Sequence, residues 1–198
     1  MTPFAYHPHA HVRRHGPQGY ARHESFRPWL RDEFSFRCVY CLRREQWDRA
    51  IKLEVEHFQP TSRTPQERLN YDNLVYACAR CNAAKAAQSV SDATQVFLDG
   101  SVTVQPDGQI IGHSPDARRL ISDLRLNSAE TIHFRRLWLE IVTMAYRFAP
   151  DLYHRLMGYP DDLPDLSRMR PPNGNTRPAG VSQSHFARRE RGELPTTY

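Results

Sequence analysis

The sequence predicts an α+β fold, with a small core of two strands and a helix followed by a β-hairpin and further helices. Two stretches of strand-like residues lie between two pairs of cysteines. A helix-favouring run then follows the second pair. The chain has 198 residues without an internal repeat, so we expect one small core with appendages.

The spacing of the cysteines is typical of a structural zinc site. The four residues form two C-x2-C pairs, Cys38 with Cys41 and Cys78 with Cys81, and 36 residues separate the pairs. Two intervening residues let both thiolates of a pair face one tetrahedral ion. A redox site of the thioredoxin type needs only one such pair, and four unrelated buried thiols would not explain the doubled spacing. Four protein ligands leave no position for water, so we expect Zn²⁺ to have a structural role.

The segment between the cysteine pairs predicts two strands and a loop. Apolar and charged residues alternate from Leu53 to Glu56, and Pro60 ends this first strand. A polar loop covers 61–70, and a second strand covers 71–78. The helix-favouring run begins at Asn82, which we expect to cap the helix.

Three motifs in this segment resemble those of a known family. They are Glu56-His57-Phe-Gln-Pro60, Asp72-Asn73-Leu74 and Cys78-x-x-Cys81-Asn82-x-x-Lys85, in this order. Together with the paired cysteines they resemble the zinc-stapled HNH endonuclease family, over roughly residues 30–90. The resemblance implies a treble-clef-like ββα-metal core and hydrolysis of phosphodiester bonds.

The resemblance also implies a role for each matching residue. His57 corresponds to the general base, and Asn73 to the asparagine that holds the base and its loop. Glu56 and Asn82 correspond to the ligands of a catalytic ion, Mg²⁺ or Mn²⁺. Lys85 corresponds to a helix lysine near the nucleic-acid phosphate.

Two departures from the family pattern affect the expected metal site. Glu56 stands where the family more often has aspartate, and Asn82 stands where many members have histidine. An asparagine ligand favours a hard, oxygen-preferring ion. In a regular strand Glu56 and His57 point to opposite faces, whereas Glu54 and Glu56 share one face. Glu54 is therefore a reserve metal ligand.

Composition divides the chain into four regions. We expect a basic, His/Pro-rich flexible segment at 1–28 and the zinc-stapled core at 29–90. Accessory hairpin and helices should occupy 91–166, and an Arg/Pro-rich flexible tail 167–198.

The accessory region carries its own turn and capping signals. Asp99-Gly100 predicts a hairpin over 96–104, and a second turn follows at 106–108. Ser114 and Ser128 are expected to cap two helices.

Positive charge is concentrated at the two ends of the chain. Residues 1–31 contain five arginines and one acidic residue, and residues 167–198 contain six arginines and two glutamates. With a net charge of +5, this distribution favours a polyanionic partner. We expect DNA, with RNA as an open alternative. No apolar stretch reaches the roughly 18 residues of a membrane span, and no secretory signal precedes the core, so we expect no membrane partner and a cytoplasmic location.

The combined hypothesis is a metal-dependent HNH endonuclease that nicks one DNA strand per site. The family resemblance implies 5′-phosphate and 3′-hydroxyl products and, by analogy, a setting in restriction or phage defence. One alternative is a zinc-stapled nucleic-acid-binding module without catalysis. Another is a nuclease subunit that a partner protein activates.

Overall fold

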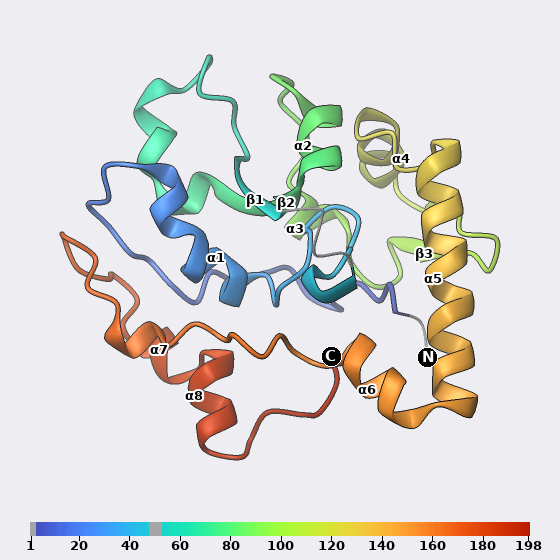
Figure 1. Ribbon diagram of the computed structural model, residues 1–198. Coiled ribbons are helices and arrows are strands. Elements are labelled where there is room, and N and C mark those ends of the chain that lie inside the picture. Colours follow the sequence, from blue (N-terminus) through green and yellow to red (C-terminus); the bar gives the residue numbers. More distant parts are fainter. Residues whose placement is uncertain (1–2, 48–52) are drawn as a thin grey trace.

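A two-stranded antiparallel sheet lies at the centre of the molecule (Figure 1). The computed structural model describes residues 3–47 and 53–198. Strand β1 (Leu53–His57) pairs with β2 (Leu74–Cys78). β2 is buried along its whole length, whereas β1 is half-buried after its first residue. β1 therefore presents its side chains both to the core and to a partly open surface.

Helix α2 (Ala79–Lys85) follows β2 without a loop. It packs against both strands, which completes the predicted core of two strands and a helix. Two details differ from the sequence expectation. Cys78 is the N-cap residue of α2, so Asn82 is the fourth residue of the helix and not its cap. The chain enters β2 through a 3-10 turn, η4 (Tyr71–Asn73), so the strand begins at Leu74.

The other helices and strands surround this core. Before it come the 3-10 helix η1 (His23–Phe26), α1 (Arg27–Glu33) and the 3-10 helix η2 (Glu45–Trp47). The 3-10 helix η3 (Pro65–Leu69) lies in the connection between β1 and β2. The elements after α2 are α3 (Ala93–Val96), β3 (Val102–Val104), β4 (Ile110–Gly112), α4 (Pro115–Asp123), α5 (Ala129–Phe148), α6 (Pro150–Met157), the 3-10 helix η5 (Leu166–Arg168), α7 (Ala179–Ser182) and α8 (His185–Glu190).

The hairpin of the accessory region is displaced from its predicted position. Strands β3 and β4 pair across the turn at 106–108, where Gly108 has a φ of +89°. The expected strand that begins at Val96 is wrong, because Val96 ends α3. Asp92 caps that helix by accepting a hydrogen bond from the Thr94 backbone N–H, which favours helix over strand.

Both predicted helix caps are confirmed. The Ser114 side chain accepts a hydrogen bond from the Ala117 backbone N–H at the start of α4. The Ser128 side chain does the same for Thr131 at the start of α5. None of the described helices combines the length and the apolar character that a membrane span requires.

A second apolar cluster lies where α5 and α6 meet Leu42 and Trp47, which follow the first cysteine pair. Trp47 is buried there and stacks on Trp138 of α5, with ring centroids 4.4 Å apart. The Arg135 side chain of α5 is also buried, and it donates hydrogen bonds to the backbone carbonyls of Gly108 and Leu126. Arg135 therefore ties the hairpin to α5 and is not available to contact DNA.

The two ends of the chain pack against α1, where flexible segments were expected. The Asp32 carboxylate is fully buried. It accepts hydrogen bonds from His15 Nε2 and from His185 Nδ1, both at 2.8 Å. Residues 16–18 also exchange backbone hydrogen bonds with residues 173–176. Composition alone gave no sign of this order, because the Pro-rich ends are held by a carboxylate far away in the sequence.

Candidate functional site

The four cysteines gather into one buried cluster. Their Sγ atoms all lie within 4.8 Å of one another, and none of the four forms a disulfide. Cys38 and Cys41 lie in a tight knuckle, where the Leu42 N–H donates to the Cys38 carbonyl. The other pair, Cys78 and Cys81, lies at the junction of β2 and α2. This donor set fits a structural Zn²⁺ that ties the knuckle to the ββα unit.

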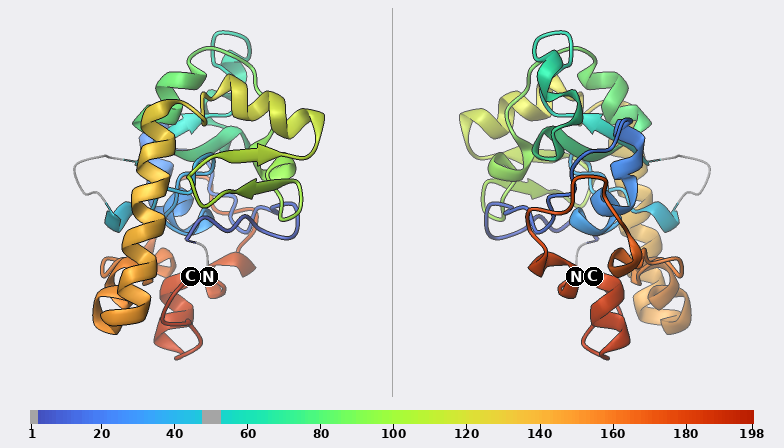
Figure 2. Two further views of the ribbon diagram at one scale, coloured as in Figure 1. Left: turned by 90° about the vertical axis from the view of Figure 1, so that its right-hand side faces the viewer. Right: turned by 90° about the vertical axis from the view of Figure 1, so that its left-hand side faces the viewer.

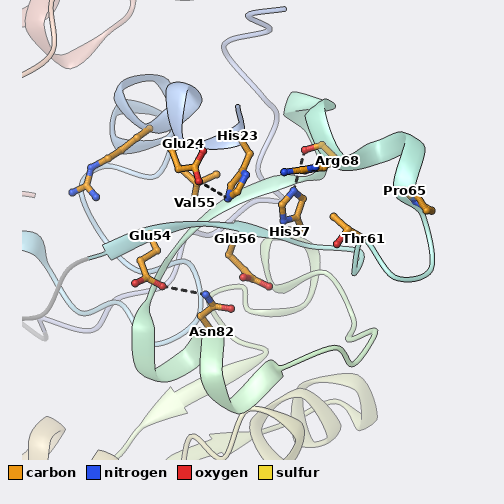
Figure 3. A pocket seen from close by; sticks show the side chains of 11 residues that line it. His23, Glu24, Glu54, Val55, Glu56, His57, Thr61, Pro65, Arg68 and Asn82 are labelled. Atoms are coloured by element: carbon orange, nitrogen blue, oxygen red, sulfur yellow. Dashed lines mark hydrogen bonds and ion pairs between the residues drawn. The ribbon is translucent and has the colours of Figure 1, made fainter. Parts of the chain in front are cut away.

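The acidic side chains of β1 point toward α2 (Figure 3). The Glu54 carboxylate accepts a hydrogen bond of 3.1 Å from Asn82 Nδ2. The Glu56 carboxylate lies 2.9 Å from Lys85 Nζ. The two glutamates share a face because they are two residues apart in a strand. Both therefore remain candidates for the acidic metal ligand.

His57 ends β1 and points to the other side of the strand (Figure 3). Its Nε2 lies 3.0 Å from the backbone carbonyl oxygen of Arg68, which can only accept a hydrogen bond. In the neutral ring this contact places the proton on Nε2 and the lone pair on Nδ1. The opposite directions of Glu56 and His57 follow the regular alternation of the strand.

Asn73 holds the loop that supports His57. Its side-chain oxygen accepts a hydrogen bond of 2.7 Å from the Gln59 backbone N–H. Its Nδ2 donates to the carbonyls of Gln59 and Glu67, at 3.1 and 3.3 Å. One buried amide thus joins the chain just after His57 to the 3-10 helix that carries the Arg68 carbonyl.

A cleft of about 830 Å³ brings these side chains together. One edge of β1 is open, because among the described residues only β2 pairs with it. The cleft lies along this strand and is lined by Glu56 from one face and His57 from the other. Polar residues of the core line it: Glu54, Glu56, His57, Arg68 and Asn82. His23 and Glu24 of η1 and Arg27 at the start of α1 also line it.

His23 is the one lining histidine that sequence reasoning did not single out. Its ring centroid lies 4.9 Å from that of His57. Burial lowers the pKa of His23, and the nearby His57, Arg68 and Arg22 lower it further against the opposing effect of Glu24. This environment favours the neutral form of the His23 ring. One of several histidines in a His/Pro-rich segment carries no sequence signal for this position.

Comparison with known families decides the class of this core. Residues 38–88 match the family model for HNH endonuclease, and no curated protein matches the chain. This segment is an HNH endonuclease domain. The match begins at the first cysteine and includes His57, Asn73 and Asn82. The family match supports a nuclease-type function for the HNH domain, and the cysteine cluster is consistent with the predicted zinc-stapled ββα core.

The HNH domain offers oxygen donors for a second, catalytic ion. Among the described residues, the cysteines form the only cluster of three or more His, Cys, Asp or Glu side chains arranged to hold a metal. The cleft instead has the carboxylates of Glu54 and Glu56 and the amide oxygen of Asn82, which its Nδ2 bond to Glu54 leaves free. Such a sparse set of oxygen donors fits a hard divalent ion that completes its coordination with water and phosphate.

Lys85 has a contact that differs from the one its motif position implied. Its side chain is fully buried, and Nζ forms an ion pair with Glu56 at 2.9 Å. A buried and paired ammonium is not available to a nucleic-acid phosphate. In the HNH domain Lys85 instead fixes the Glu56 carboxylate against α2.

Proposed function

We propose that the HNH domain hydrolyses phosphodiester bonds in DNA and nicks one strand per site. The observation that carries the proposal is the hydrogen bond from His57 Nε2 to the Arg68 carbonyl. It leaves Nδ1 as the proton acceptor of a histidine in a cleft that also contains Glu54, Glu56 and Asn82. A neutral imidazole with an accepting nitrogen is the group that general-base attack by water requires.

In the proposed reaction His57 Nδ1 takes a proton from the attacking water. Asn73 keeps the ring in place, because its amide holds both ends of the loop that carries the Arg68 carbonyl. Glu56 and Asn82 would hold Mg²⁺ or Mn²⁺, with Glu54 in reserve. When bound, that ion supplies Lewis-acid stabilisation of the charge on the phosphate and on the leaving oxygen. Departure of the 3′-oxygen gives 5′-phosphate and 3′-hydroxyl ends.

The charge around the cleft supports a nucleic-acid substrate. Arg27 and Arg68 both line the cleft. Arg68 forms no ion pair with a described residue. Arg27 donates a hydrogen bond of 2.6 Å to the Leu53 carbonyl, and its one ion pair among the described residues is a long contact of 3.8 Å with Glu45. Both guanidinium groups are placed to meet the phosphates that flank the scissile bond. A role in restriction or phage defence, with activation by a partner protein, extends the proposal by family analogy.

The test is nicking of supercoiled plasmid by the purified chain with Mg²⁺ or Mn²⁺. The His57→Ala variant should lose about 10²–10⁴ in rate, because a general base acts in the transition state. Its zinc content, melting temperature and DNA affinity should stay close to those of the wild type. His9→Ala, which removes an exposed histidine outside the cleft, is the matched control and should nick normally.

Two outcomes would overturn the proposal. If His57→Ala nicks plasmid as fast as the wild type, the general-base assignment is wrong. If the wild type binds DNA but nicks neither DNA nor RNA with any divalent ion, the chain is a binding module without catalysis.

A further inference from the structure

Helix α5 exposes an apolar stripe that no described element covers. Leu137, Met144 and Phe148 have exposed fractions of 43%, 57% and 72%, and the half-buried Ile141 lies between them. Their spacing of four, three and four residues places all of them within a narrow arc of the helix surface. In the left view of Figure 2, none of the described segments passes in front of α5.

The stripe is separate from the side of α5 that packs on the core. The buried residues Arg135, Val142 and Ala145 face the hairpin and α6. The spacing of the stripe is that of the a and d positions of a coiled coil, which bury their side chains against a second helix. One side of α5 thus packs on the core, and a second side has the residue pattern that packs against another helix.

Charge along one flank of the stripe indicates which helix fits it. Glu140 and Arg147 are exposed on the same flank, seven residues apart. That separation is about 10 Å along the helix, too far for the two side chains to pair with each other. Neither forms an ion pair with a described residue. One flank therefore presents one negative and one positive charge, both unpaired.

We propose that α5 pairs antiparallel with α5 of a second copy of this chain. A two-fold axis near the middle of the stripe would place Leu137 against Phe148 of the other copy and Ile141 against Met144. In that register Glu140 of each copy meets Arg147 of the other, so both unpaired charges gain a partner. A parallel pair would instead bring this flank against the opposite flank of the partner helix, so neither charge would gain a charged partner.

The length of the stripe sets the expected strength of the dimer. From Leu137 to Phe148 the stripe spans about 17 Å at 1.5 Å per residue. One helix pair of that length buries less than the roughly 1,200–2,000 Å² of standard protein interfaces. The dimer should therefore be concentration-dependent and dissociate in the micromolar range. The proposal does not depend on the nuclease activity, because association is measured without nucleic acid.

The test is sedimentation of the zinc-loaded full chain over a range of protein concentrations. The wild type should form dimers, and Met144→Glu should remain monomeric at the same concentrations. Thr143→Glu, an exposed position on the same helix but off the stripe, should dimerise like the wild type. Circular dichroism and the melting temperature of each variant verify that it is folded.

Charge reversal tests the antiparallel register. Glu140→Arg and Arg147→Glu alone should each weaken dimerisation about tenfold, because each replaces an attraction with a repulsion. The double variant should restore wild-type dimerisation, since the two charges have exchanged places. A wild type that stays monomeric up to about 200 µM, near typical weak-interface affinities, would overturn the proposal. So would a Met144→Glu dimer of wild-type strength, or a double variant as weak as both single variants.

Discussion

The cysteine cluster and the cleft of the HNH domain take neighbouring residues of α2, Cys81 and Asn82, yet their donor atoms differ in burial and in partners. At the zinc centre all four thiols are buried, within 4.8 Å of one another. In the cleft, the side chains of Glu54 and Asn82 are only partly buried and bond to each other. The first site is complete within the chain, whereas the second leaves donor atoms for an ion and a substrate. This difference indicates separate roles: an ion held by the four cysteines would stabilise the fold, whereas an ion held in the cleft would take part in the reaction.

The largest effect should come from the zinc centre. Cys81→Ser should release Zn²⁺ and unfold the ββα unit, because metal binding and folding are coupled in a site of this kind. Zinc content by mass spectrometry of metals and melting by circular dichroism measure the change. Ala79→Ser, an exposed position in the same helix, should keep both properties. Unchanged zinc content and melting temperature in Cys81→Ser would mean that the cysteines do not hold a structural ion.

The next effect should come from the ligands of the cleft. Glu56→Gln should reduce nicking by at least about 10²-fold, since even indirect support of a metal is worth about 10–100-fold. Glutamine retains an oxygen that can accept from Lys85, so the buried ammonium keeps a partner and the fold should survive. Asn82→Ala should lose activity similarly, and raised Mn²⁺ should partly restore both variants.

Glu54→Gln distinguishes the two candidate carboxylates. Activity close to the wild type would retain Glu56 as the metal ligand. A loss in Glu54→Gln together with an active Glu56→Gln would assign the ligand role to Glu54, which bonds to Asn82. Plasmid nicking at matched Mg²⁺ concentrations measures both variants.

The buried carboxylate of Glu33 makes the stability of the fold depend on pH. Burial alone would raise the pKa of Glu33, but hydrogen bonds from His11 and from the Arg14 backbone lower it to about 2, against an ordinary 4.5. A carboxylate with a depressed pKa stabilises the fold above its ordinary pKa and loses that contribution as pH falls. The wild type should therefore lose about 3 kcal/mol of unfolding free energy through Glu33 as pH falls from about 4.5 to about 2.

Comparison of variants isolates that contribution. Glu33→Gln should show a shallower acid dependence of unfolding by urea than the wild type. The exposed Glu130→Gln should follow the wild type, and the acid sensitivity of the zinc centre is common to all three proteins. Parallel curves for Glu33→Gln and the wild type would contradict the depressed pKa.

The smallest expected effect is on the salt dependence of DNA affinity, through exposed arginines of the C-terminal segment. Arg170 and Arg189 are exposed in the C-terminal segment, and each hydrogen-bonds only backbone carbonyls. If the segment contacts DNA, replacing both with glutamine should lower the slope of log affinity against log salt by about 1 to 2. The melting temperature should stay constant. An unchanged salt slope would show that these arginines lie away from the DNA.

The sequence predicted most of the core because its signals are local. The doubled cysteine spacing indicated the zinc site, and the strand, loop and helix order indicated the ββα unit. The candidate site was also found by its motif, since His57, Asn73 and Asn82 lie at fixed distances from the cysteines. Their roles remain predictions that the experiments above address.

What the sequence did not reveal depends on contacts between distant segments. The sequence alone does not show that Lys85 is buried, because its ion-pair partner Glu56 lies 29 residues away on another element. His23 joins the cleft only through the packing of η1 on β1. The order of both chain ends likewise depends on Asp32, whose partners are 17 and 153 residues away.

The position of those partners bears on how the molecule is made. A ribosome releases the zinc ligands and the whole HNH core well before residue 185. Until then Asp32 lacks the ring and the backbone N–H of His185, and a carboxylate without its partners resists burial. The nascent nuclease core is therefore expected to stay loosely closed around α1 during synthesis. Final closure around Asp32 therefore waits until α8, which carries His185, has emerged from the ribosome.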